Sequence, residues 1–242
     1  DRAVPETQLR FPFSWRYAIH GWNWLFLKKT PVDADEKKAR GRYLVDVLGH
    51  CSACHSPRNG MMAERDDRYL AGGEAGGWIA PNITSDPVSG IGGWSREELV
   101  QYLRTGRNDK AQAAGGMAEA VEHSLRFLSD DDLDAIADWL KQTPPIVTVQ
   151  GTKAAYHYQG GGQGDPAGQA LYAAACASCH RLGGEGAYDG HFPSLTHNST
   201  VGSEQANNLI MVMLHGVQRQ GETLRTGFRG FAVAWITGNW PS

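Results

Sequence analysis

Cys51-Ser-Ala-Cys54-His55, with a second copy at Cys176-Ala-Ser-Cys179-His180, decides the fold of this chain. A C-x-x-C pair followed directly by histidine is the attachment signature of c-type haem. In such a motif the thiols form thioethers to the haem vinyl groups, and the histidine is placed to become the proximal iron ligand. The sequence therefore predicts two covalent haems c, with His55 and His180 as iron ligands.

The alternative interpretation of the cysteines is a zinc site or a redox dithiol. All 4 cysteines belong to the two motifs, so none remains for a disulfide framework or for additional metal ligands. A zinc site would require the two motifs to meet across half the chain. Because each pair carries its own histidine, we expect haem at both motifs.

The composition of the 242 residues is that of a globular protein, with 41% hydrophobic and 20% charged residues. The net charge of −3 and the lack of a basic block argue against a nucleic-acid partner. The 30 glycines and 8 tryptophans suit haem domains, in which loops wrap a porphyrin that replaces much of the aliphatic core.

The chain contains an internal repeat, because a glycine-containing helical pattern precedes each haem motif. We expect an all-α fold of two tandem class I cytochrome c domains with long loops around the haem. The predicted boundaries are 35–145 for domain A, 146–164 for a glycine-rich linker and 165–242 for domain B. Residues 1–34 are predicted to be the tail of a preceding domain or a linker.

Local signals place several helix ends. Ser95-Arg-Glu-Glu98 is a capping box that opens a helix, and Gly106 is expected to end it. Ser129 is predicted to cap the last helix of domain A, and Asp165-Pro166 the first helix of domain B. Ser203 is predicted to cap a further helix that ends at Gly216. The last helix of domain A has one apolar face at i, i+3, i+4 and i+7, formed by Leu133, Ile136, Ala137 and Leu140.

A low-spin electron-transfer haem also needs a sixth ligand, for which methionine sulfur is the expected donor. In domain A we expect Met117, in a glycine-rich loop before the last helix, as the haem-binding iron ligand. Met61 and Met62 lie too close in sequence to His55 to reach the opposite haem face. In domain B no methionine follows Gly216, and Met211 and Met213 lie inside a predicted helix, where they are interpreted as core residues. The sixth ligand therefore stays open, with His191, His197 and His215 as possible substitutes.

Further polar residues are candidates for hydrogen bonds to haem propionates: Arg58, Asn82, Thr84, Trp94, Tyr102 and Arg104. Residues of these types are more often ordinary surface or core residues.

Stretches outside the haem motifs carry a family resemblance: residues 49–58, 80–86, 90–95, 116–124, 192–195 and 207–210. With the motifs, they resemble the multihaem cytochrome c subunit of membrane-bound periplasmic dehydrogenases for alcohol, gluconate, sorbitol or fructose. The resemblance covers most of residues 10–225. Such subunits usually carry three haem domains, so it implies that this chain holds the tail of the first, the whole second and most of the third. The first haem domain is absent from it.

The resemblance implies electron transfer without substrate chemistry of the chain's own. Electrons would arrive from a catalytic dehydrogenase subunit carrying flavin or pyrroloquinoline quinone. They would leave to membrane ubiquinone or a downstream cytochrome. The alternatives are a free periplasmic dihaem shuttle and a haem peroxidase, although the sequence shows no distal acid–base constellation for the latter.

The C-terminal end departs from the family pattern, which leads us to expect a Met-Pro-x-Phe ligand loop near 225–231 and a final helix. Residues 226–242 contain no methionine. Their codons, read one base earlier, allow a helix-like pattern similar to Leu128–Leu133. A truncated or frameshifted end and a naturally divergent end are both open hypotheses.

The N-terminal segment bears on where in the cell the protein is located. Trp15–Leu27 is aromatic but too short to span a membrane. Trp22, Trp24 and Phe26 beside Lys28-Lys29 suit a membrane interface or the surface of a partner subunit. Because covalent haem attachment in bacteria occurs outside the cytoplasmic membrane, we expect a removed or upstream leader and a periplasmic, peripherally membrane-associated protein.

Overall fold

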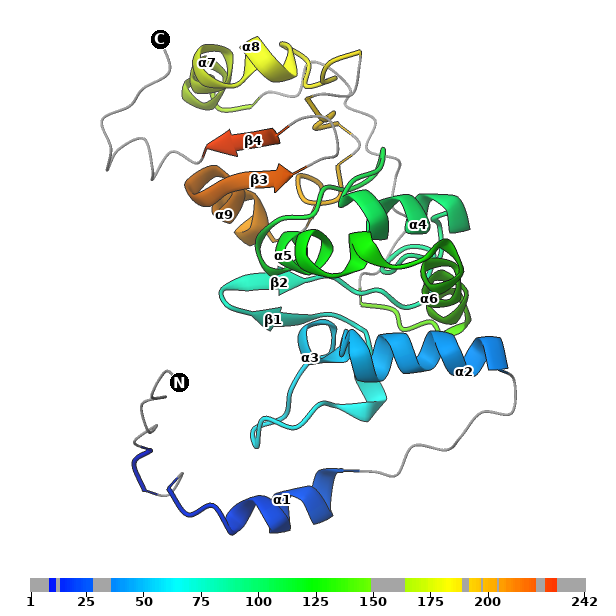
Figure 1. Cartoon of the computed structure of the whole chain (residues 1–242). Coiled ribbons are helices and arrows are strands. Elements are labelled where there is room, and N and C mark those ends of the chain that lie inside the picture. Colours follow the sequence, from blue (N-terminus) through cyan, green and yellow to red (C-terminus); the bar gives the residue numbers. More distant parts are fainter. Residues whose placement is uncertain are drawn as a thin grey trace, which may run out of the picture. The chain divides into compact units, whose positions relative to one another are not determined.

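The structure is a computed structural model that describes residues 9–11, 14–27, 36–148, 164–188, 192–196, 198–203, 205–220 and 225–229 (Figure 1). The chain divides into two compact units, Asp1–Ala34 and Asp35–Ser242. The haem motifs both lie in the second unit.

The first unit contains helix α1 (Ala18–Phe26), which has no buried residue. Trp22 and Phe26, one turn apart, contact each other with their rings tilted by 50° and the ring centroids 5.3 Å apart. Trp24 is 83% exposed, and Trp15, Tyr17, Ile19 and Leu25 are exposed as well. The helix thus presents aromatic and aliphatic side chains without a core of its own.

The region around the first motif, residues 36–148, is helical and is called region A below. Its helical elements in chain order are α2 (Glu36–Tyr43), the π-helix η1 (Leu44–Leu48), α3 (Ser52–His55), the 3-10 turn η2 (Asp66–Arg68), α4 (Arg96–Thr105), α5 (Gly115–His123), the 3-10 turn η3 (Leu125–Phe127) and α6 (Asp130–Gln142).

The predicted helix caps of region A are confirmed. Ser95 accepts a hydrogen bond from the Glu98 amide, and the Glu98 carboxylate accepts one from the Ser95 amide. Gly106 ends α4 in the left-handed region at φ 72°, where glycine pays no steric penalty. Ser129 accepts from the Asp132 amide at the start of α6.

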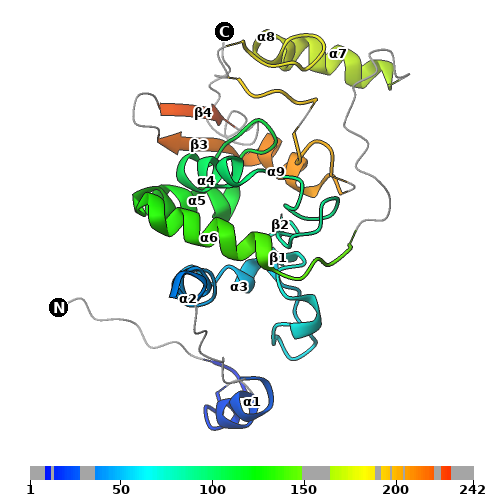
Figure 2. The ribbon, with the colours of Figure 1, turned by 90° about the vertical axis from the view of Figure 1, so that its right-hand side faces the viewer.

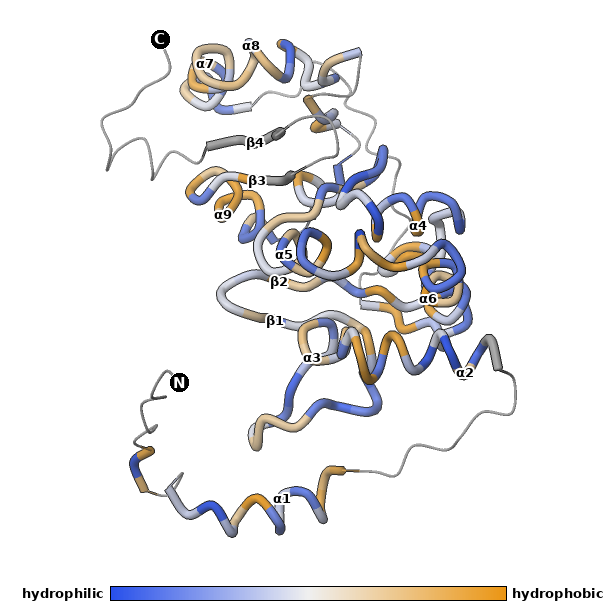
Figure 3. Tube along the Cα trace, in the orientation of Figure 1, coloured by the Kyte–Doolittle hydropathy of each residue, from blue (hydrophilic) through white to orange (hydrophobic). Residues whose placement is uncertain are grey.

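The core of region A forms where α2 and η1 cross α6 and where α4 covers α6. Figure 3 shows hydrophobic and hydrophilic residues interspersed along α4 and α6, and the buried hydrophobic residues of both helices belong to one core cluster. A Cβ atom at Gly41 would lie 2.3 Å from the Ala135 carbonyl oxygen and 2.9 Å from Trp139 Cβ. Glycine at this position therefore sets how closely α2 and α6 approach. The predicted apolar face of α6 is buried, as Leu133, Ile136, Ala137 and Leu140 are all at most 5% exposed.

A two-stranded antiparallel hairpin follows α3. Strand β1 (Gly73–Ala75) pairs with β2 (Trp78–Ala80), with Ala75 opposite Trp78 and Glu74 opposite Ile79. The connecting Gly76 and Gly77 have φ angles of 59° and 81°. Two positive φ angles are what a two-residue type I′ turn requires.

Region B comprises the described residues from 164 to 229. It contains α7 (Pro166–Ala175), α8 (Ala177–His180), α9 (Asn207–His215) and a second hairpin of β3 (Gly216–Gln220) and β4 (Arg225–Arg229). The Asp165 side chain accepts from the Gly168 amide, which confirms the predicted cap of α7.

The prediction that Ser203 caps α9 is wrong. The helix begins at Asn207, after Ala206, and the Ser203 hydroxyl instead accepts from the Gln205 amide in a local turn. The predicted end at Gly216 is confirmed.

The described chain is rich in helix, as expected, but the all-α class is not confirmed. Two hairpins add short β-sheets that the helical patterns did not predict. The β3–β4 hairpin occupies part of the segment where the family pattern led us to expect a ligand loop. Residues 230–242, on which the truncation or frameshift hypothesis rests, lie outside the described residues.

The first residues of the predicted linker contact region A. Ile146 and Thr148 are held to region A, because the Asn82 amide donates to the Ile146 carbonyl at 2.7 Å and the Thr148 amide donates to Ser89 Oγ at 2.9 Å. The remainder of the predicted linker up to residue 163 lies outside the described residues.

Candidate haem-binding sites

The first motif lies on one short helical turn. Cys51 precedes α3, and the amide of His55 donates to the Cys51 carbonyl at 2.9 Å. Cys51 is half-buried against the core of region A and Cys54 is exposed. One turn of helix thus places both thiols and the histidine as a single compact group.

A proline carbonyl orients His55. Its Nδ1 lies 2.7 Å from the Pro81 carbonyl oxygen, so Nδ1–H is the donor and Nε2 keeps its lone pair. Burial lowers the pKa of His55, while the Pro81 hydrogen bond acts in the opposite sense. A neutral imidazole with a fixed tautomer is the form that ligates iron, and such an outer partner normally sets the ring orientation.

The second motif repeats this arrangement. His180 ends α8, and its Nδ1 lies 3.0 Å from the Pro193 carbonyl oxygen. The Phe192 ring stands edge-on to His180 at 6.3 Å between centroids. The two motifs therefore share the same histidine–proline contact although 26 residues separate the partners in one and 13 in the other.

Sequence reasoning missed both prolines as functional residues. The contact uses a backbone carbonyl, which leaves no side-chain signature. The available signal was that a proline lies in the family-like stretches after each motif, at Pro81 and at Pro193.

All four cysteines lie in the described residues and are free thiols. Burial, with a smaller contribution from the Asp46 charge, raises the pKa of the Cys51 thiol to about 11, and burial also raises the pKa of Cys176. Within the described part of the chain, no group of three or more His, Cys, Asp or Glu residues is arranged to hold a metal ion.

Met117 is not in a loop, as the sequence suggested, but is the third residue of α5. It is half-buried and packs against the same core cluster that Cys51 contacts. The helix begins at Gly115, whose φ is 53° and where a Cβ would lie 2.4 Å from Trp78 Cε2. The Trp78 indole thus packs on the start of the helix that carries Met117. Its role as the sixth ligand stays a prediction.

Met211, Met213 and His215 of region B lie on α9. Met211 is half-buried, Met213 is 38% exposed, and His215 is exposed at the end of the helix. His191 and His197 lie outside the described residues.

Several propionate candidates have structural partners instead. Asn82 Oδ1 accepts from the amide and hydroxyl of the fully buried Thr84, at 2.8 and 2.7 Å. Together with its bond to Ile146, this contact shows that Asn82 fixes a loop. Arg104 pairs with Asp130, and Trp94 meets Tyr102 edge-on at 5.6 Å.

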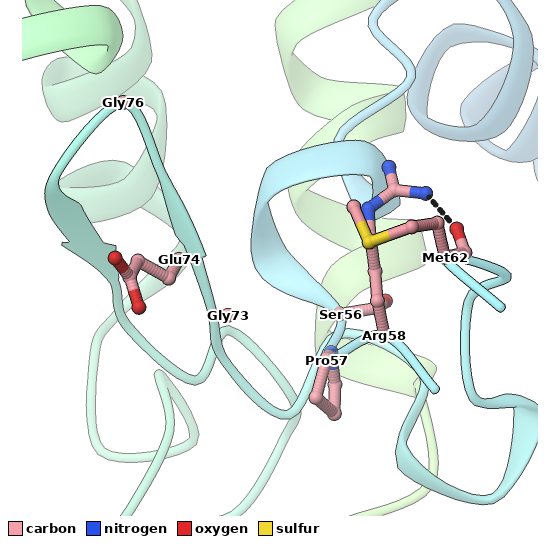
Figure 4. Close-up of a pocket in the computed structure, with 7 residues that line it drawn as sticks. All are labelled: Ser56, Pro57, Arg58, Met62, Gly73, Glu74 and Gly76. Atoms are coloured by element: carbon pink, nitrogen blue, oxygen red, sulfur yellow. Dashed lines mark hydrogen bonds between the residues drawn. The ribbon is translucent and has the colours of Figure 1, made fainter. Parts of the chain in front are cut away.

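Arg58 lies at a pocket of about 430 Å³ between the loop that follows the first motif and the β1–β2 hairpin (Figure 4). Its guanidinium donates to the Met62 and Ala53 carbonyls at 2.7 and 3.0 Å. Arg58 therefore braces the motif and the loop of Met62.

Comparison of the sequence with known proteins identifies the family. Residues 166–236 match the family model described as Cytochrome c. The fructose dehydrogenase cytochrome subunit of Gluconobacter japonicus is 42% identical over 241 residues, covering 90% of this chain and 50% of that protein. The cytochrome c subunit of the quinone alcohol dehydrogenase of Gluconacetobacter polyoxogenes is 36% identical over 234 residues, covering 88% and 50%. The gluconate 2-dehydrogenase cytochrome c subunit of Pantoea cypripedii is 38% identical over 204 residues, covering 76% and 45%.

The helical scaffold, the C-x-x-C-H motifs and the matched domain define a c-type cytochrome. More narrowly, the chain belongs to the family of cytochrome c subunits of fructose, alcohol and gluconate dehydrogenases. It spans about half the length of these relatives.

Proposed function

We propose that this chain is an electron-transfer cytochrome subunit with two covalent haems c. It passes electrons from a catalytic dehydrogenase subunit, carrying flavin or pyrroloquinoline quinone, to membrane ubiquinone or another cytochrome. The observation that carries the proposal is the repeated site, in which each motif histidine is held by a proline carbonyl. The names of the relatives, all dehydrogenase subunits, support the partner class.

The chain's own residues would bind and orient the haems. Cys51 and Cys54 hold the first haem and Cys176 and Cys179 the second, each haem supplying a one-electron iron couple when bound. His55 and His180 present Nε2 toward the metal because Nδ1 is engaged by the prolines. Met117, on α5, is proposed as the sixth ligand of the first haem.

The proposed organisation is a domain A at 35–145 and a domain B at 165–242, joined by 146–164 and preceded by 1–34 as the tail of an earlier domain or a linker. We propose a periplasmic location at the membrane surface. The exposed aromatic residues of α1 support attachment to a membrane or partner over a free shuttle. No helix in the ranges that the structure describes is long and apolar enough to cross a membrane.

The test is to express the chain with a c-type haem maturation system and count haems by pyridine haemochrome. The wild type should carry two covalent haems, and the Cys51→Ala/Cys54→Ala and Cys176→Ala/Cys179→Ala variants one each. The reduced wild type should then be reoxidised rapidly by a water-soluble ubiquinone. Absence of covalent haem, or reduced haems that neither ubiquinone nor a soluble cytochrome can oxidise, would refute the proposal.

A further inference from the structure

The two haem-binding regions meet at the β1–β2 hairpin of region A, against which α9 of region B packs. Figures 1 and 2, at right angles to one another, both show α9 beside β2. Two further contacts join the regions: β3 packs against α5, and the Ser199 amide donates to the Lys110 carbonyl at 2.9 Å. The contact at the hairpin differs from these because side-chain amides of α9 form hydrogen bonds with backbone groups of the hairpin.

Asn208 closes the open edge of β2. The Ile79 amide donates to Asn208 Oδ1 at 2.9 Å, and Asn208 Nδ2 donates to the Ile79 carbonyl at 2.7 Å. Ala75 and Trp78 flank the two-residue turn as a hydrogen-bonded pair, and such pairs alternate with unbonded ones. The polar groups of Ile79 therefore point away from β1, and the Asn208 carboxamide meets both as a neighbouring strand would.

Asn207 adds a single hydrogen bond at the turn itself. Its Nδ2 donates to the Gly77 carbonyl at 2.9 Å. Adjacent residues of α9 thus hold two positions of the hairpin, but Asn208 alone of the two makes a paired donor–acceptor contact in the described structure.

The clamped strand leads directly to both ligand positions of the first haem. Trp78, one residue before Ile79, packs on Gly115 at the start of α5, which carries Met117. Pro81, two residues after Ile79, accepts the hydrogen bond of His55. A displacement of β2 would therefore move the partner of the proximal histidine and the packing at the start of α5.

We propose that Asn208 is a positioning residue for electron transfer: by clamping Ile79 it fixes region B to the strand that orients His55, and so holds the two haems in one geometry. This inference rests on the proposed two-haem function. It assigns to Asn208 a role in orienting a ligand of the other region's haem, with no contact to iron.

The first test measures the clamp without any haem chemistry. Asn208→Leu keeps a branched side chain with the same number of heavy atoms and does not lower helix propensity, but it removes both hydrogen bonds. Backbone hydrogen exchange of the haem-loaded full chain should become severalfold faster at the Ile79 amide. Asn207→Leu, the matched control, should leave the Ile79 amide protected. Equal exchange at Ile79 in wild type and Asn208→Leu would overturn the clamp.

The second test measures the consequence for the haems. In Asn208→Leu the hyperfine-shifted proton resonances of the His55 ring should move. Electron redistribution between the haems after substoichiometric flash photoreduction should slow severalfold, and Asn207→Leu should have the smaller effect on both. Faster Ile79 exchange with unchanged His55 resonances and transfer rate would overturn the positioning role. Failure of the wild type itself to carry two haems or to exchange electrons between them would instead refute the proposed function.

Discussion

At the level of single residues, each motif histidine depends on a partner that carries no side-chain function. Pro81 and Pro193 offer carbonyls to Nδ1 of His55 and His180, and this leaves Nε2 available in both sites. The cysteines and histidines could be predicted because their chemistry is encoded in adjacent positions. The prolines could not, since a carbonyl belongs to every residue and the contact depends on how the intervening chain folds back.

Met117 provides the residue-scale prediction. Met117→Leu keeps an apolar side chain of similar size on α5 but removes the thioether sulfur, so the first haem should lose its weak far-red methionine–iron absorption band. Its reduction potential should fall, because methionine ligation favours ferrous iron. Absorption spectroscopy and a redox titration measure both changes.

The matched control is Met62→Leu, because Met62 is 67% exposed in the loop after the first motif. It should leave the band and both potentials unchanged. If Met117→Leu retains the full band while Met62→Leu or Met211→Leu loses it, the assignment of Met117 is wrong.

At the level of elements, the close crossing of α2 and α6 depends on Gly41. A methyl group there would meet the Ala135 carbonyl, a backbone atom that cannot rotate away, so the helices must separate. Gly41→Ala should lower the free energy of unfolding by about 1–3 kcal/mol, as overpacking in a core does. Denaturant unfolding of the haem-loaded chain, followed by helical circular dichroism, measures this loss.

Gly116→Ala is the control for this crossing. A Cβ at Gly116 in α5 would have no heavy atom within 4 Å, so the higher helix propensity of alanine should leave stability unchanged or raise it by up to about 1 kcal/mol. Equal losses in the two variants would contradict the close-approach argument.

The same pair of helices carries an ion pair with a defined pH dependence. The Arg40 guanidinium donates to both carboxylate oxygens of Asp132 at 2.8 and 2.9 Å and holds the pKa of Asp132 below its ordinary value of 3.8. A depressed carboxyl pKa stabilises the fold above the ordinary pKa, and the contribution is lost as pH falls through the folded-state value. Arg40→Gln should therefore be less stable than wild type at pH 7.

The stabilities of wild type and Arg40→Gln should converge as pH falls below the depressed folded-state pKa of Asp132, because Asp132 is then protonated in both the folded and the unfolded state. Arg65→Gln is the control: Arg65 also lowers the pKa of Asp67, but the two residues are neighbours in sequence and link no helices. Unfolding measured as a function of pH should show the larger difference for Arg40→Gln. A pH-independent difference would show that the ion pair is not its cause.

Elements defined by local chemistry were predictable, and those defined by tertiary contacts were not. Ser95, Ser129 and Asp165 cap helices through bonds to residues three positions away, so short patterns revealed them. Ser203 failed as a cap because its hydroxyl serves a local turn. The Gly76-Gly77 turn signal lies in a long loop whose flanking strands are only three residues each, too short for a periodic pattern.

At the level of the whole molecule, family and cofactor class were predictable from the sequence because motifs and flanking stretches act together. The contact of α9 with the β1–β2 hairpin was not, since Asn207 and Asn208 lie about 130 residues from their partners. From the sequence pattern alone, two adjacent asparagines in a helix are expected to face solvent. Their hydrogen bonds to the backbone of Gly77 and Ile79 form only because the fold brings α9 next to the hairpin.

Exposed tryptophans of the N-terminal unit are expected to attach the chain to the membrane surface. The exposed indoles of Trp15 and Trp24, at 62% and 83%, suit the membrane interface, where aromatic rings with a polar edge partition well. The haem-loaded chain should therefore bind vesicles of phosphatidylcholine and phosphatidylglycerol in a flotation assay, and Trp15→Ser/Trp24→Ser should reduce the bound fraction severalfold. Phe127→Ser, at a 74% exposed aromatic residue outside α1, should bind like wild type. If wild type stays in solution with these vesicles but is retained by a dehydrogenase catalytic subunit through the same tryptophans, α1 is a subunit contact and the lipid attachment is wrong.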